Sequence, residues 1–409
     1  MIEILGGLGM SSLPSGWVET NLVSCLDKVI DYRGKTPKKS ESGILTLSAK
    51  SVKMGKIDYS QAYCISKETY GKFMVRGFPQ KGDILMTTEA PLGCIAKLDR
   101  SDVSVAQRLL TLRGKKGVLD NNYLMFYLTS RRGQHELQSR ASGSTVQGIK
   151  RSEFEYVEIV LPPLPEQKAI AAVLSAFDEK IELLREQNKT LETLAQTIFK
   201  EWFVKFNYPN ATGEMVDSEL GEIPLGWRVG RLRDVVDVFD SKRIPLSSNE
   251  RQKRQGIYPY YGATKAMDYI DNYLFDGTYL LMAEDGSVMD DNGYPFLQYV
   301  WGKLWVNNHT HILQGKNGFS TDALYVFLKR RKVAGIVNGA VQLKINQTNL
   351  MNFEMLLPVD DVMQNFNELL QPMFEKIKNN ISQIQTLSKS RDTLLPKLMS
   401  GDIRVNDAV

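Results

Sequence analysis

The side chains of this chain that are best suited to chemistry are basic and polar groups beside glycines and aromatic residues on predicted loops. Arginine and lysine contact phosphate groups, whereas amides, hydroxyls and guanidinium groups can read the edges of bases. A neighbouring glycine lets the backbone approach a phosphate closely. In the first half of the chain the candidate DNA-binding residues are Arg33, Lys35, Lys38, Lys50, Arg108, Thr145 and Lys150. In the second half they are Lys242, Arg243, Tyr261, Lys265, Asn308, His309 and Lys344.

Each of these basic clusters, taken alone, also fits an ordinary solvated surface. Nucleic-acid binding is favoured because both halves carry such clusters at comparable places, although the clusters do not reveal which residues read bases. The formal net charge of +4 and the pI of about 8.7 permit nucleic-acid binding without requiring it.

Sequence signals for catalysis are missing. There is no GxxxxGK[ST] phosphate loop, no GxSxG nucleophile elbow and no HExxH metal motif. The acidic pair Glu284–Asp285 before Gly286 could suggest acid–base work, but a turn after a strand explains it better. The sequence therefore predicts no catalytic residue and no cofactor bound by the chain itself.

Metal binding and membrane insertion are not expected either. His309 and His311 alternate on a predicted strand, so their side chains should point to opposite faces. The three cysteines form no CxxC pair and no Cys/His cluster, which favours reduced core residues in a cytoplasmic protein. No apolar run approaches the roughly 20 residues of a membrane span, and the first ten residues lack the basic segment of a signal peptide.

A long predicted helix follows the first set of clusters. Residues 166–204 contain no proline or glycine, which allows an uninterrupted helix of roughly 60 Å. Its apolar residues recur at alternating spacings of three and four, the pattern of a coiled-coil seam that holds one polar residue. The seam residues are Leu174, Phe177, Ile181, Leu184, Asn188, Leu191, Ala195, Ile198 and Trp202.

The C-terminal residues 356–403 repeat this helical pattern. Their seam also holds one asparagine, so antiparallel packing with Asn188 opposite Asn380 would pair every layer and let the two amides bond to each other. The seam residues here are Phe366, Leu370, Met373, Ile377, Asn380, Ile384, Leu387, Arg391, Leu394 and Leu398.

The antiparallel register makes further predictions along the helix pair. It places Leu174 against Leu394 and Trp202 against Phe366. Pro372 lacks an N–H group, so it should kink the second helix near its start.

The chain is also a duplication. Residues 13–17 (LPSGW) reappear as 223–227 (IPLGW), and residues 142–165 are echoed by 338–361. The offset is near 210 residues at the start and near 196 at the end, so each copy is a globular module followed by a long helix. The predicted fold class is α+β: two repeated α/β modules joined by two long antiparallel helices. The predicted boundaries are 11–163 and 223–358 for the modules, 164–206 and 359–403 for the helices, and 207–222 for a linker.

The modules are predicted to contain mixed strands and helices. Glycine and proline are spread through the connections, as is typical of loop-rich sheets. In the first module the predicted strands are 43–52, 82–88 and 94–98, and the predicted helix is 121–138. In the second module the predicted strands are 279–285 and 303–313, and the predicted helix is 321–331.

These features resemble the specificity subunits of Type I restriction–modification systems. The resemblance covers essentially all of the chain after about residue 11. Its longest motif is the run LPPLPEQKAIAAVLSAFDEKIELLREQNKTLETLAQTIFKEWF at 161–203. The other motifs are DYRGKTP at 31–37, IPLGW at 223–227, YYGATK at 260–265, NFEMLLP at 352–358 and LLPKLMSGDIRV at 394–405.

The resemblance implies a non-catalytic subunit with two target-recognition domains, each reading one half of a bipartite double-stranded DNA site. It implies that the long helices set the spacer and dock two methyltransferase subunits. Those partners would use S-adenosylmethionine to methylate adenine, and motor–nuclease subunits, which use ATP, would add cleavage. Because a net charge of +4 is low for a protein that must hold DNA alone, we expect partner subunits to supply much of the phosphate contact.

Two other interpretations are left open by the sequence. A self-contained restriction or methylation enzyme would need a methyl-donor glycine loop and an Asn/Asp-Pro-Pro motif, or a nuclease carboxylate cluster. The one Pro-Pro pair, Pro162–Pro163, follows Leu161 at a helix entrance. A coiled-coil scaffold without a DNA role would explain the long helices but not two repeated modules with basic loops.

Overall fold

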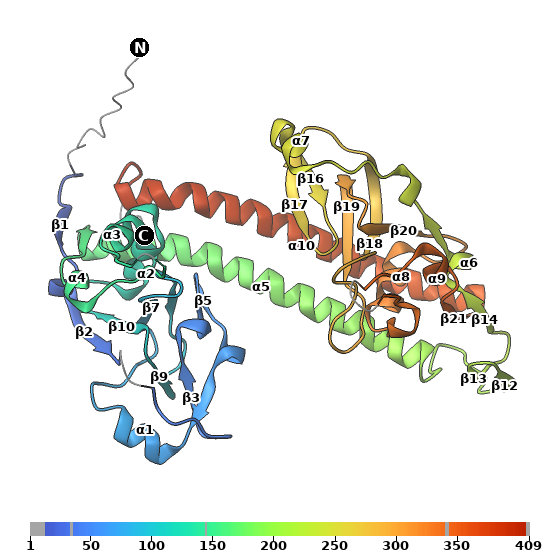
Figure 1. Ribbon diagram of the computed structural model, residues 1–409, viewed down its shortest axis with the longest axis horizontal. Coiled ribbons are helices and arrows are strands. Elements are labelled where there is room, and N and C mark those ends of the chain that lie inside the picture. The colour runs from blue at the N-terminus through green and yellow to red at the C-terminus, as the bar shows by residue number, and fades with distance from the viewer. Residues whose placement is uncertain (1–12, 33–35, 144, 340–342, 406–409) are drawn as a thin grey trace, which may run out of the picture. The chain divides into compact units, whose positions relative to one another are not determined.

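The computed structural model describes residues 13–32, 36–143, 145–339 and 343–405 (Figure 1). The chain forms two compact units. The first unit comprises the chain up to Leu183 together with the chain from Gln383 onward, and the second unit is Leu184–Ser382. Among the described residues, a helix that could serve as a membrane span is absent.

Short strands and helices form the module of the first unit. Its strands are β1 (Val18–Asn21), β2 (Leu26–Asp31), β3 (Ile44–Leu47), β4 (Val52–Lys53), β5 (Lys56–Ile57), β6 (Tyr63–Ile65), β7 (Ile84–Thr87), β8 (Ile95–Lys97), β9 (Val103–Val105), β10 (Leu109–Gly114) and β11 (Glu158–Leu161). Its helices are α1 (Lys67–Phe73), α2 (Asn121–Thr129), α3 (Arg131–Ser139) and α4 (Arg151–Phe154), with 3₁₀ turns η1 (Val23–Cys25), η2 (Ala49–Ser51) and η3 (Tyr59–Gln61). The main sheet is antiparallel in the order β2-β10-β7-β8, beside a second sheet β6-β3-β9 and the pairs β1-β11 and β4-β5.

The second unit contains a larger, mixed sheet, which is antiparallel except for one parallel strand pair. Its strands are β12 (Met215–Ser218), β13 (Gly221–Pro224), β14 (Arg228–Arg231), β15 (Val236–Val238), β16 (Gln255–Tyr261), β17 (Ala266–Ile270), β18 (Phe275–Ala283), β19 (Leu297–Val306), β20 (Thr310–Gly315) and β21 (Glu354–Leu357). Its helices are α6 (Leu232–Val235), α7 (Ser248–Lys253), α8 (Thr321–Lys329) and α9 (Gln347–Met351), with η4 (Asp240–Lys242) and η5 (Ala334–Ile336). The sheet order is β15-β20-β18-β19-β16-β17, and β12 with β13 forms a hairpin inside and just beyond the predicted linker.

The two modules share one plan, as the sequence repeats predict. The sheet order β2-β10-β7-β8 corresponds to β15-β20-β18-β19. The flanking pair β1-β11 places Val18 opposite Leu161, and β14-β21 places Arg228 opposite Leu357. These registers reproduce the offsets of 210 and 196 residues between the copies. The predicted duplication is therefore confirmed at the level of strand pairing.

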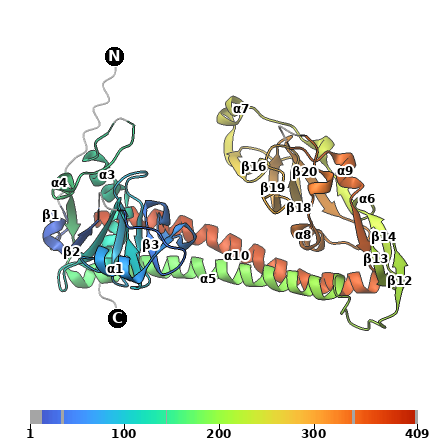
Figure 2. The ribbon, with the colours of Figure 1, turned by 60° about the horizontal axis from the view of Figure 1, so that its bottom comes forward.

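One helix in each module packs between the sheet and the long helices. In the second unit, α8 lies between the sheet and the long helices (Figure 2). It contributes Leu324 and Phe327 to a buried cluster with Leu280 of β18 and Phe366 of the C-terminal helix. In the first unit, α2 takes the corresponding place, in a cluster with β7, β10 and both long helices. The apolar stripe of each long helix is thus part of the core of a module.

The long helices pack together inside each unit. They are α5 (Leu164–Phe203) and α10 (Asp360–Ser400). In the first unit, Arg391 Nη1 lies 2.5 Å from Asp178 Oδ1, and Leu174 shares a hydrophobic cluster with Leu394. Pro372 lies within α10, which continues past it; the predicted kink stays a prediction.

In the second unit the helix pair carries the seam asparagines. Asn380 Nδ2 donates to Asn188 Oδ1 at 2.8 Å, and the Trp202 and Phe366 ring centroids lie 5.8 Å apart. The buried seam residues of both helices are Leu174, Ile181, Leu184, Ala195, Trp202, Phe366, Leu370, Ile377, Asn380 and Leu398. The half-buried seam residues include Leu191, Ile198, Ile384 and Leu394.

Replacing both asparagines, Asn188→Leu with Asn380→Leu, is expected to raise the free energy of unfolding of the second unit by about 1–2 kcal/mol. Asn380 is fully buried and its Oδ1 has no hydrogen-bond partner among the described residues, so the polar layer costs stability while it fixes register. Asn188→Leu alone should instead lower stability by about 1–3 kcal/mol, because the buried Asn380 amide loses its 2.8 Å bond and keeps only the 3.4 Å bond to Gln187 Oε1. Urea unfolding of the three proteins measures both effects, and a double variant less stable than the single variant would contradict this account.

Two predicted elements are interrupted in the structure. The predicted helix 121–138 is two helices, because Ser130 is extended (φ −66°, ψ 161°) and its Oγ accepts from the Gly133 N–H to cap α3. A Cβ at Gly133 would lie 2.1 Å from the Tyr127 carbonyl oxygen, so the tight connection requires glycine. The predicted strand 43–52 likewise divides into β3 and β4 around η2.

The predicted strand 303–313 is also wrong as a single strand. β19 ends at Val306 and β20 begins at Thr310. The Asn307 side chain holds the turn between them, since its Oδ1 accepts from the His309 N–H at 2.9 Å and from Thr310 Oγ1 at 3.3 Å. His309 therefore lies in a turn, whereas His311 lies buried on β20.

Candidate nucleic-acid interface

The first unit has a polar cleft of about 270 Å³ where three loops meet. The loops follow β7, precede β10 and join α3 to α4. Two predicted DNA contacts, Arg108 and Lys150, line the cleft. A third, Thr145, is exposed and lies in the sequence between the lining residues Ser142 and Val146. The lining residues are Thr88, Glu89, Gln107, Arg108, Ser142, Val146, Gly148, Ile149 and Lys150.

Main-chain hydrogen bonds hold these three loops together. The Thr88 N–H donates to the Arg108 carbonyl, and the Ile149 N–H donates to the Thr88 carbonyl, both at 2.9 Å. Ser142 and Gly148 exchange two N–H···O bonds of 2.9 and 3.0 Å, which close the third loop. Because this frame uses main-chain atoms, it places few demands on the side chains that line the cleft.

The Arg108 side chain is paired with an acidic neighbour on the cleft wall. Its Nε lies 2.7 Å from Glu89 Oε1, and the two side chains are 50% and 41% exposed. An ion pair this exposed contributes about 0–1 kcal/mol. The guanidinium can therefore exchange the carboxylate for a phosphate or a base edge at little cost, and its planar fork suits either acceptor.

The second unit repeats the main-chain frame. The Glu284 N–H donates to the His309 carbonyl, and the Ile345 N–H donates to the Glu284 carbonyl, both at 2.9 Å. Asn338 and Lys344 exchange two bonds of 2.8 Å. The corresponding residues are Thr88 and Glu284, Arg108 and His309, Ser142 and Asn338, Gly148 and Lys344, and Ile149 and Ile345.

His309 also has an acidic partner at the corresponding position. Its Nδ1 lies 2.8 Å from Asp285 Oδ2, and the imidazole is 50% exposed. Asp285 follows the frame residue Glu284, as Glu89 follows its counterpart in the first unit. The exposed Asn308 precedes His309. Both units therefore place a basic side chain beside a carboxylate, and in both the residue before the basic one carries an amide: Gln107 in the first unit and Asn308 in the second.

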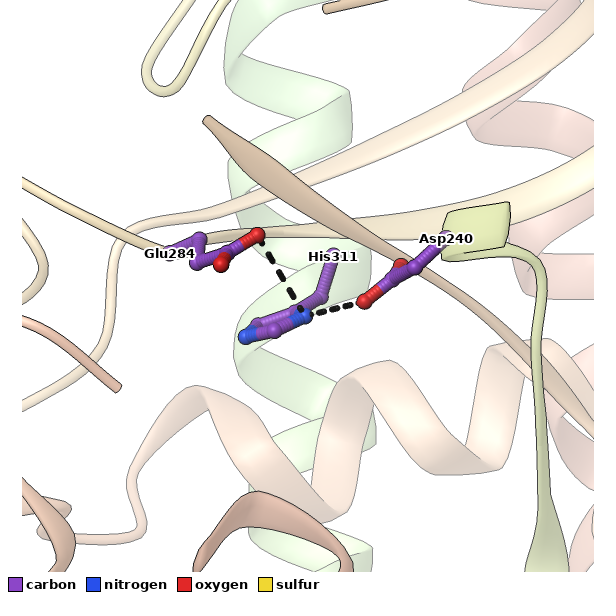
Figure 3. Close-up of side chains that lie close together, drawn as sticks. All are labelled: Asp240, Glu284 and His311. Atoms are coloured by element: carbon purple, nitrogen blue, oxygen red, sulfur yellow. Dashed lines mark hydrogen bonds and ion pairs between the residues drawn. The ribbon is translucent and has the colours of Figure 1, made fainter. Parts of the chain in front are cut away.

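A buried charged cluster surrounds His311, which lies on β20 two residues after His309 (Figure 3). The His311 imidazole lies between the carboxylates of Asp240 and Glu284, with Nδ1 2.5 Å from Asp240 Oδ2 and 4.0 Å from Glu284 Oε2. The other ring nitrogen, Nε2, lies 2.8 Å from the Ile345 carbonyl oxygen. Since both ring nitrogens face acceptors, the imidazole donates from both and is a cation in this arrangement.

The surroundings of His311 favour that cation. Burial by itself would lower its pKa. The hydrogen bond and charge of Asp240, the carbonyl of Ile345 and the charge of Glu284 outweigh burial and raise the pKa of His311 above its ordinary value of 6.5.

The same cluster has a spacing that could suggest a metal site. One ligand atom from each of Asp240, Glu284 and His311 lies within 4.8 Å of the others. However, a doubly donating imidazole has no lone pair for a metal, and Glu284 already pairs with Arg243 at 2.6 Å and Lys344 at 3.2 Å. The arrangement is an ion-pair network that ties η4, β20 and the following loops together.

Arg243, a predicted DNA contact, is part of this network. Its side chain is 15% exposed, and Nη1 donates to the carbonyl oxygens of Thr310 at 2.9 Å and Asn308 at 3.3 Å. These bonds position the turn that carries Asn308 and His309. A direct contact between Arg243 and DNA stays a prediction.

Two further predicted contacts of the first unit lie outside the cleft lining. Lys50 is exposed in η2, and Lys38 is exposed before β3. Arg33 and Lys35 fall outside the described residues. The structure therefore brings only part of the predicted set together in this unit.

Three predicted contacts of the second unit lie on other surfaces. Lys242 is exposed with its Nζ 5.0 Å from the Phe239 ring centroid. Tyr261 is half-buried in β16, and burial raises its pKa. Lys265 is exposed in the turn between β16 and β17, where its carbonyl accepts from the Gly262 N–H at 2.9 Å. Their role in DNA binding stays a prediction.

The acidic members of the site were missed by sequence reasoning. Glu89 and Asp240 were not selected, and Asp285 was interpreted as part of a plain turn. One signal could have found a pair of them: the 196-residue offset between the copies carries Glu89 onto Asp285.

Comparisons with known proteins agree on one family. A family model described as the Type I restriction modification DNA specificity domain matches residues 18–193 and 224–387. The specificity subunit of the Type I restriction enzyme MjaIX from Methanocaldococcus jannaschii is 31% identical over 367 residues, which cover 84% of this chain and 82% of that protein. The HindI specificity subunit of Haemophilus influenzae is 20% identical, covering 79% of this chain and 87% of that one. The fold is similar to the crystal structure of a Type I restriction–modification S subunit from M. genitalium, with a TM-score of 0.61, 16% identity and coverage of 97% and 98%.

Proposed function

We propose, from the premise that this chain belongs to the Type I restriction–modification DNA specificity family, that each of its two units reads one half of a bipartite DNA target. The observation that carries the proposal is the repeated main-chain frame, which presents Arg108 beside Glu89 in one unit and His309 beside Asp285 in the other. Two similar frames with different side chains suit two similar readers of different sequences.

The long helices have a proposed part in assembly. We assign to α5 and α10 the setting of the spacer between the half-sites and the docking of two methyltransferase subunits. Apolar side chains that the seam does not use support docking: Leu183 on α5 is 47% exposed in the first unit, and in the second Leu194 on α5 and Leu369 on α10 are 45% and 40% exposed.

The chemistry is assigned to partner subunits. A specificity subunit is not itself catalytic, so S-adenosylmethionine would bind to the methyltransferase subunits, which would methylate adenine in the target. Motor–nuclease subunits would use ATP and cleave DNA. In this scheme the present chain contributes DNA sequence recognition and the assembly surface.

The test is methyl transfer from S-adenosylmethionine to double-stranded DNA of random sequence. Three samples are compared: this chain alone, the methyltransferase subunit encoded beside it alone, and the two together. Only the mixture is expected to methylate DNA, and the two proteins should co-purify. Methylation or cleavage by this chain alone would show an active site of its own and overturn the proposal.

A further inference from the structure

Two short segments hold corresponding places in the two units. β10 begins at Leu109, opposite Thr87 of β7, and β20 begins at Thr310, opposite Ala283 of β18. The residue just before each strand gives its carbonyl to the frame bond. The two residues before each strand are Gln107–Arg108 and Asn308–His309. Each pair is a carboxamide followed by a basic side chain.

The fold does not demand these side chains. The frame uses the carbonyl groups of Arg108 and His309, and half of each side chain is exposed to solvent. The Arg108 backbone even disfavours an arginine, because its φ of +69° lies in the left-handed region where glycine costs least. A basic residue that occupies this position at a conformational cost points to a task beyond folding.

Each basic side chain is paired with an acidic one, and the acidic residue comes from the corresponding loop of its unit: the loop after β7 in the first unit and the loop after β18 in the second. Glu89 lies 2.7 Å from Arg108 Nε, and Asp285 lies 2.8 Å from His309 Nδ1. A neighbouring position has diverged: Lys150 lines the cleft of the first unit, and the residue that follows Ile345 in the second unit is Asn346. The amide, the base and the acid thus recur while the residue after the frame isoleucine differs.

These three groups match the edges of bases in the major groove. A carboxamide pairs with adenine N6 and N7, an arginine fork with guanine O6 and N7, and a carboxylate accepts from cytosine N4. A neutral imidazole offers one donor and one acceptor, so it cannot form the arginine fork. Arginine and histidine at the same place therefore favour different bases.

We infer that Gln107–Arg108 and Asn308–His309 are corresponding base-reading pairs, one for each half of the target. Arg108 selects guanine at one position of the first half-site, and His309 selects a different base, or selects less strongly, at the corresponding position of the second. Glu89 and Asp285 hold the reading side chains in place before DNA binds. This inference rests on the proposed function, because it requires that both units contact the target.

The experiment uses the complex of this chain with its methyltransferase subunit, random-sequence DNA and S-adenosylmethionine, followed by sequencing of the methylated sites. Arg108→Gly should reduce discrimination at one position of one half-site by about 10–100-fold, the loss expected for one bidentate contact. His309→Ala should change only the other half-site. His309→Arg should create a guanine preference at the corresponding position of that half-site.

Two controls separate recognition from folding. Arg108→Gly relieves the left-handed backbone, so its thermal midpoint should be unchanged or higher than that of the wild type. Arg132 forms a matched exposed pair with Glu19 at 2.5 Å, with side chains 41% and 44% exposed, outside the cleft lining. Arg132→Ala should therefore leave the methylated motif unchanged.

The outcomes distinguish this inference from the proposed function. If the wild-type complex methylates a split motif and both Arg108→Gly and His309→Ala keep every base preference, the inference is overturned and the proposed function stands. If the wild-type complex methylates DNA without sequence preference, the proposed function fails and the inference falls with it. A change confined to one half-site for each variant supports both.

Discussion

Phe366→Ala is expected to lower the free energy of unfolding of the second unit by about 3–5 kcal/mol, the cost of removing a fully buried aromatic ring. The Phe366 ring lies at the centre of an aromatic group that joins both long helices to α8. Its centroid is 4.7 Å from that of Phe203, 5.8 Å from Trp202 and 6.2 Å from Phe327. Loss of the ring leaves a cavity that these rigid neighbours cannot close.

Urea unfolding followed by tryptophan fluorescence measures this loss, because four of the five tryptophans lie in the second unit. Leu369→Ala is the matched control on the same helix, since Leu369 is 40% exposed. It should change stability by less than about 1 kcal/mol. Equal losses for Phe366→Ala and Leu369→Ala would show that the aromatic group is not the core that joins the helices to the module.

Asp240→Ala is expected to destabilise the second unit by about 3–5 kcal/mol, because removing one partner of a buried pair leaves an uncompensated charge. Asp240 Oδ2 faces His311 Nδ1 at 2.5 Å, and Oδ1 accepts from the Ile312 N–H at 2.9 Å. Asp237→Ala is the control, because Asp237 is 55% exposed and pairs with Lys316 at 3.1 Å. The control should cost less than about 1 kcal/mol, and urea unfolding of both variants makes the comparison.

The charge of His311 gives the same network a pH dependence. Its pKa is raised in the folded chain, so its contribution to stability is complete below the unfolded value of about 6.5 and is lost as pH rises through the folded value. Asp240→Asn removes the negative charge that raises this pKa. The difference in thermal midpoint between wild type and Asp240→Asn should therefore be largest near pH 6 and shrink toward pH 9. A difference that stays constant over this range would mean that His311 is not charged in the fold.

Local sequence patterns were enough to predict the duplicated architecture. The heptad spacing gave the two long helices, and the repeated motifs gave two modules whose strand registers match at the expected offsets. The resemblance to Type I specificity subunits is confirmed by the family match. A Type I specificity subunit therefore describes this chain better than a scaffold without a DNA role or a self-contained enzyme does. The predicted domain boundaries stay a prediction, because the compact units divide both long helices.

Long-range contacts limited what the sequence could predict about the site. The break at Ser130 depends on Gly133 packing against the Tyr127 carbonyl, which no propensity reveals. The single strand predicted over 303–313 failed because Asn307 caps a tight turn there. Arg243 looked like a free basic residue, but it bonds to Glu284, which lies 41 positions away in the sequence. Partners of this kind become visible only when the sheet brings distant loops together.

The most direct test of the central claim is the motif methylated by the complex of this chain with its methyltransferase subunit. Sequencing of methylated random DNA should show two short specified blocks separated by a fixed number of unspecified bases. That result would mean that two separate readers act at a set spacing. A single continuous motif, or a gap of variable length, would contradict the assignment of one half-site to each unit.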